Sequence, residues 1–126
     1  MLQTLVTIHS WTRWLVLAAL VGAIVVGVVR FRAKAEWSPH LHQVAVMAID
    51  IQVAIGAIIW LFYDGAKRGF FYAVLHPVAM LLALGVAHAG FAIAKRRDEP
   101  RSWVIATSAY SVALLLIVGG IPWDRL

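Results

Sequence analysis

The chain has 126 residues, of which 63% are hydrophobic and 13% charged, and its mean hydropathy is +0.86. A soluble domain of this size would show polar helix faces, which are almost absent here, so the composition indicates one α-helical integral membrane domain. The lack of cysteine excludes disulfides, iron–sulfur clusters and thiolate metal sites. The net charge of +5 does not indicate a nucleic-acid partner, because the basic residues lie between apolar spans, where they report orientation.

The first apolar span begins with the motif HSWTRW (residues 9–14), whose tryptophans are typical of the membrane interface. A signal peptide is the competing interpretation, but its basic residues should precede the apolar run, and here they follow it at residues 30–34. We therefore expect a retained helix. With it, the chain has four stretches long enough to cross a bilayer. They cover about residues 2–29, 41–63, 70–94 and 102–121.

The short connections between these spans predict an all-α, up-down-up-down bundle of four transmembrane helices, forming a single domain over residues 1–126. Basic residues are concentrated in the first and third loops. These loops carry Arg30, Arg32, Lys34, Lys95, Arg96, Arg97 and Arg101. The other side carries Arg13, Lys67, Arg68 and Arg125. The positive-inside rule then places both termini on the outer, periplasmic side of a bacterial inner membrane.

The third span has no formal charge, yet it contains two imidazoles, His76 and His88. Histidine inside a membrane span is costly and usually has a partner or a ligand. Twelve residues of helix separate the two by roughly 18 Å along the axis and about 120° around it. The two histidines therefore cannot bind one metal ion, and we expect each to have its own partner at its own depth.

His9, near the outer end of the first span, and His76, about six residues into the third, lie at one depth. Two histidines from different helices in an apolar four-helix bundle are the usual scaffold for a six-coordinate haem b. We predict His9 and His76 as the iron ligands, with Arg13 serving a propionate or orienting His9, and Trp14 packing on the ring. The same pattern suits a quinone site or a proton relay, and a hydrated, unpaired His9 is the plainest alternative.

Asp50 of the second span and His88 of the third agree in height within roughly one turn at the inner level. A carboxylate at that depth should be protonated or paired. We predict an Asp50–His88 pair that handles protons or holds helices together, and no second haem. His40 and His42 flank the start of the second span, where we expect them to be solvated.

Four short motifs follow one another along the chain: HSWTRW at residues 9–14, DIQ at 50–52 with Gly56 after it, LH at 75–76, and IPW at 121–123. Together they resemble a family of small bacterial four-span membrane proteins labelled "cytochrome b-like". The resemblance covers nearly the whole chain and implies four membrane helices with candidate haem ligands at His9 and His76. Relatives often have histidine where this chain has Asp50, so no ligand role carries over to that position.

Three functions remain open. The first is a haem b-binding electron-transfer protein, linked to quinol and, if it is an enzyme, part of a membrane oxidoreductase. The second is a non-catalytic accessory subunit of a larger respiratory or photosynthetic complex. The third is a quinone-binding or proton-relay site without haem that uses Arg13, Asp50 and His88. The expected partners are the lipid bilayer together with quinone, a second copy or a larger membrane complex.

Overall fold

The computed structural model describes residues 1–97 and 100–125, and the regular structure in that part is entirely helical. This confirms the predicted all-α class. Its four long helices are α1 (Leu2–Arg32), α2 (His40–Phe62), α3 (His76–Ala94) and α4 (Arg101–Gly120). A π-helical turn, η2 (Phe71–Leu75), leads into α3, and the short 3₁₀ turns are η1 (Gly65–Lys67) and η3 (Trp123–Arg125).

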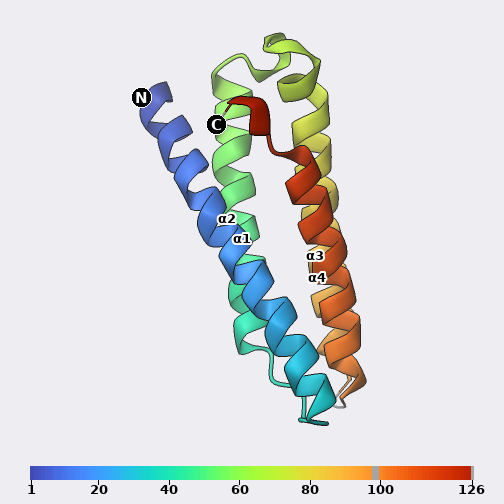
Figure 1. Cartoon of the computed structure of the whole chain (residues 1–126). Helices are drawn as coiled ribbons and strands as arrows, with labels where there is room; N and C mark the ends of the chain where they lie inside the picture. Colours follow the sequence, from blue (N-terminus) through green and yellow to red (C-terminus); the bar gives the residue numbers. More distant parts are fainter. Residues whose placement is uncertain (98–99, 126) are drawn as a thin grey trace.

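Consecutive helices run antiparallel, so that both chain termini lie at one end of the bundle, here called the terminal end (Figure 1). Each helix packs against two neighbours in the ring α1–α2–α3–α4, and the α3–α4 contact is the most extensive while the α2–α3 contact is the least. The close α3–α4 approach requires glycine, because a Cβ added at Gly90 would overlap the Cβ of Ala109. Small residues of this kind let membrane helices pack closely.

Each helix buries one narrow stripe, in which residues recur at intervals of three and four as a packed helix face requires. On α1 the stripe consists of Val16, Leu20, Ala23 and Gly27. On α3 it consists of Ala83, Ala87, Gly90 and Ala94. The remaining apolar side chains of these helices therefore face outward.

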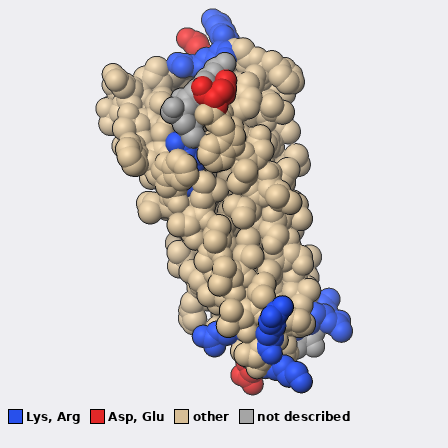
Figure 2. Space-filling model, viewed as in Figure 1, with Lys and Arg blue, Asp and Glu red and all other residues tan. Residues whose placement is uncertain are grey.

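This outward apolar surface fits a multi-pass membrane protein. In the described chain, four helical segments of 20 to 31 residues are long and apolar enough to cross a bilayer. In the most apolar stretch of each segment, at most 33% of the residues are buried inside the bundle. Figure 2 shows charged side chains gathered at the two ends and a broad uncharged band between them. The bundle thus presents lipid with an apolar belt and water with charged ends.

Candidate functional site

A cavity of about 620 Å³ lies between the four helices toward the terminal end. This volume is within the range of roughly 300–1,000 Å³ that is typical of small-molecule sites. Its walls are mainly apolar, and polar side chains enter it at a few points. These polar residues are His9, Ser10, Arg13, Gln52, Arg68, Tyr72 and His76.

The structure brings together the two histidines that the sequence places at one depth. The ring centroids of His9 and His76 are 6.2 Å apart, and their planes are nearly perpendicular, at 85°. At a metal–nitrogen distance of about 2 Å on each side, the ring centres of two axial imidazoles lie roughly 6 Å apart. The observed separation is therefore suited to two ligands on opposite sides of one metal.

A proline explains the unusual helix turn that precedes His76. Pro77 has no N–H with which to bond the carbonyl of Ala73, and its ring crowds that carbonyl. The helix widens into η2, where the His76 N–H reaches back five residues to the Phe71 carbonyl. The Ala73 carbonyl accepts a hydrogen bond from the indole Nε1 of Trp60 on α2 instead, at 3.2 Å. Single π turns of this kind often occur at functional sites.

The end of α4 orients the His76 ring. His76 Nδ1 lies 2.7 Å from the backbone carbonyl oxygen of Gly120, the last residue of α4. A carbonyl only accepts hydrogen bonds, so the hydrogen sits on Nδ1 and the lone pair of Nε2 stays available. A ligating histidine typically donates its other N–H to a carbonyl in this manner. The contact depends on glycine, because a Cβ added at Gly120 would stand 2.7 Å from Cε of Met80 and 3.0 Å from Cβ of Ala79.

Helix α2 holds His9 in place through two residues. Gln52 Nε2 donates to the His9 backbone carbonyl at 2.6 Å, and the Thr12 hydroxyl donates to Gln52 Oε1. One helical turn further along α2, Gly56 leaves room for the His9 ring, since an added Cβ would stand 3.0 Å from its Cε1. The sequence alone predicts no role for Gln52 or Gly56, although their spacing of four residues puts them on one helix face.

His9 and Arg13 carry buried polar atoms that lack partners. His9 Nδ1 and Arg13 Nε make no hydrogen bond within the described residues. Arg13 and Arg68 both line the cavity, whereas no carboxylate among the described residues does. An apolar cavity with two guanidinium groups and unused nitrogen atoms favours an amphipathic, negatively charged ligand.

Trp14, predicted to pack on a cofactor, does not line the cavity. Its ring packs against Trp123 at 6.4 Å between centroids, and the Arg13 guanidinium carbon lies 5.1 Å from the Trp14 ring centroid. Trp14 therefore contacts the site only through Arg13, as a cation–π partner of a lining residue.

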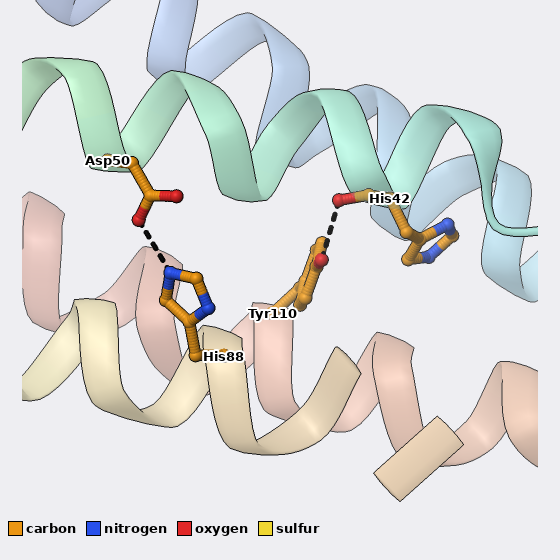
Figure 3. Close-up of polar contacts among 4 residues, drawn as sticks. All are labelled: His42, Asp50, His88 and Tyr110. Carbon is orange, nitrogen blue, oxygen red and sulfur yellow. Dashed lines mark hydrogen bonds and ion pairs between the residues drawn. The ribbon is translucent and has the colours of Figure 1, made fainter. Parts of the chain in front are cut away.

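Asp50 and His88 form a separate pair between α2 and α3. The distance from His88 Nε2 to Asp50 Oδ1 is 2.5 Å, and the two side chains point toward each other in Figure 3. Neither residue lines the cavity. The histidines of the third span therefore have different partners, His9 for His76 and Asp50 for His88.

The expected solvation of His42 is wrong, because its side chain is fully buried. Its ring packs against the rings of Trp37, Trp103 and Tyr110. Trp103 Nε1 donates to the Ala35 carbonyl at 2.9 Å, which holds the first loop over the start of α2. The Tyr110 hydroxyl donates to the His42 backbone carbonyl at 2.6 Å (Figure 3). Neither His42 ring nitrogen has a hydrogen-bond partner among the described residues.

Comparison with known proteins gives no match: neither a protein-family model, nor a curated protein, nor a solved structure is significantly similar to this chain. Within the described residues, no group of three or more histidine, cysteine, aspartate or glutamate side chains is placed to hold a metal ion. A metal held by His9 and His76 would therefore need most of its donor atoms from a cofactor.

Proposed function

We propose that this protein binds one haem b in the cavity and transfers electrons in the membrane, with His9 and His76 as the axial ligands. The observation that carries the proposal is the 6.2 Å separation of their ring centroids inside a largely apolar cavity of about 620 Å³. The four pyrrole nitrogens of a porphyrin would supply the donor atoms that the protein lacks. The hydrogen bond from His76 to Gly120 supports the same assignment.

Arg13 and Arg68 fit the charged edge of such a cofactor. Haem carries two propionates, which need cations or water, and both arginines line the cavity, where Arg68 Nε also donates to the Tyr63 carbonyl. The partnerless Nε of Arg13 is a donor that a carboxylate could use. Arg13 and Arg68 lie toward the terminal end, so the propionates would reach the surface there. We assign that end to the outer side of a bacterial inner membrane.

Ligation by two imidazoles decides the kind of chemistry. The bound group would supply a one-electron iron couple whose axial positions are both filled. Because His9 and His76 would both hold the iron, no coordination site would be open to oxygen or substrate. The protein's own contribution is then to hold the two rings, exclude water with apolar walls and compensate the propionates. These roles favour an electron carrier.

The test is an absorption spectrum of the detergent-purified protein, expressed with a supply of haem. We expect a Soret band with sharp α and β bands after reduction. His9→Ala and His76→Ala should each shift the bands or remove them, whereas His40→Ala, at an exposed histidine outside the cavity, should leave them unchanged. A protein without a Soret band, or bands unaltered by both cavity variants, would refute the proposal. Quinone in the lipid extract of a colourless protein would favour the quinone-site alternative.

A further inference from the structure

The Asp50–His88 pair is half exposed at a depth where lipid tails would surround it. The side chain of Asp50 is 42% exposed and that of His88 is 49% exposed. Asp50 lies near the middle of α2, and His88 lies six residues before the end of α3, about 9 Å along the helix axis. The hydrocarbon core of a bilayer is about 30 Å thick. The pair therefore lies inside the core and on the outside of the bundle.

Such a position calls for a further polar partner. Ionisable residues in membrane spans almost always face protein or water, because hydrocarbon satisfies none of their hydrogen bonds. Asp50 uses one carboxylate oxygen and His88 uses Nε2 in their mutual contact. The second oxygen of Asp50 and Nδ1 of His88 make no further hydrogen bond in the part of the chain that the structure describes. One carboxylate oxygen and one ring nitrogen of this half-exposed pair are thus left without a hydrogen bond.

The surface around the pair is shaped for a close helix contact. Its small residues, Ala54 and Ala57 on α2 and Gly85 and Ala89 on α3, are all exposed. A Cβ added at Gly85 would meet no atom within 4 Å, so the bundle itself does not require glycine there. The α2–α3 contact is also the least extensive in the helix ring. Exposed small residues beside a polar pair are what closely packed membrane helices use at an interface.

We propose that a second copy of this chain docks on the α2–α3 face, defined as Asp50, Ala54, Ala57, Gly85, His88 and Ala89, to form a twofold dimer. A twofold axis places the same surface on both sides of an interface. The second pair would then meet the first in reverse order, with the free nitrogen of each copy beside the free carboxylate oxygen of the other. The small residues would allow the backbones to approach closely enough for this contact.

Self-complementarity is the reason to choose a second copy as the partner. As an imidazolium–carboxylate ion pair, each copy offers one Nδ1–H donor and one carboxylate acceptor, and a second copy returns one of each. Lipid tails offer neither, and headgroups lie outside the hydrocarbon region. Of the residues that define this face, Ala57 alone also lines the cavity, and the dimer does not depend on the proposed function.

The absence of cysteine makes the test direct, because a single introduced cysteine can cross-link only to another copy or to a different protein. Ala89→Cys, treated in native membranes with a short bismaleimide, should give a band of twice the monomer mass. Gly119→Cys is the matched control, since Gly119 is exposed on α4 and away from this face. A dimer band from Ala89→Cys but not from Gly119→Cys supports the proposal.

A second variant separates dimerisation from folding. Gly85→Leu adds a side chain whose Cβ would meet no atom of the same copy within 4 Å, and this side chain would block the approach of a second copy. Introduced together with Ala89→Cys, it should abolish the dimer band while the helical circular dichroism stays the same. Gly119→Leu, also free of neighbours within 4 Å, should leave the band intact. Equal cross-linking at positions 89 and 119, no cross-linking at 89, or a product containing only a different protein would overturn the proposal.

Discussion

The side chain of His76 lies against the last carbonyl of a different helix, with Nδ1 2.7 Å from the backbone oxygen of Gly120. The chain turns to an extended conformation at Ile121, directly after this contact, and continues into Pro122. The carbonyl is therefore at a helix end, where it has no partner along the helix. The C-terminal end of α4 thus orients the His76 ring.

This relationship predicts that Gly120→Ala destabilises the protein. The new Cβ would stand 2.7 Å from Cε of Met80 and 3.0 Å from Cβ of Ala79, so α4 must shift away from α3. Overpacking of this kind typically costs about 1–3 kcal/mol. Thermal unfolding in detergent should show a lower Tm. Gly119→Ala is the control, because its Cβ would meet nothing within 4 Å. Equal Tm values for the two variants would contradict the proposed packing.

Trp60→Phe should also lower the stability. The substitution keeps an aromatic ring of related shape but removes the Nε1–H that bonds the Ala73 carbonyl, which Pro77 leaves without a helical partner. A fully buried carbonyl left unsatisfied costs about 1–3 kcal/mol, and this partly buried one should cost about 1 kcal/mol. Trp11→Phe, at a side chain that is 71% exposed, should have little effect on Tm. If Trp60→Phe behaves like Trp11→Phe, the indole does not support the π turn.

Gln52→Leu should weaken the attachment of His9. It removes the hydrogen bonds with the His9 carbonyl and the Thr12 hydroxyl, each with a typical net contribution of about 1 kcal/mol. The expected results are a lower Tm and, if the cavity binds haem, a smaller Soret absorbance per protein. Gln43→Leu is a matched control, since Gln43 is exposed on the same helix. A full Soret band in Gln52→Leu would show that His9 is held without this contact.

Helix positions and residue depths could be predicted from the sequence, because the rise per residue is fixed at about 1.5 Å and apolar runs mark the spans. This is why His9 and His76, and likewise Asp50 and His88, were placed at common depths. The direction in which a side chain faces depends on packing between helices. The exposure of Asp50 and His88 to the outside of the bundle therefore cannot be predicted from the sequence.

The widened turn before His76 and the burial of His42 have tertiary causes. Pro77 marks a disturbed helix, but the π turn also depends on Trp60, which comes from another helix. His42 looks solvated beside Pro39 at a helix start, and it is buried because Trp37 and Trp103 cover it. Packing of this kind forms between segments that are far apart in the sequence, so no local sequence pattern predicts it.

His42 provides a last prediction, because its size and its polarity can be tested separately. Its ring fills a fully buried position among three aromatic rings, so His42→Ala should leave a cavity and cost about 2–5 kcal/mol. Its two nitrogens have no partner among the described residues, so His42→Phe removes no hydrogen bond and should be neutral or stabilising. The Tm of His42→Ala should therefore lie well below that of the unaltered protein, and the Tm of His42→Phe should equal or exceed it. A loss in His42→Phe as large as in His42→Ala would show that the imidazole nitrogens are satisfied by bound water or a ligand.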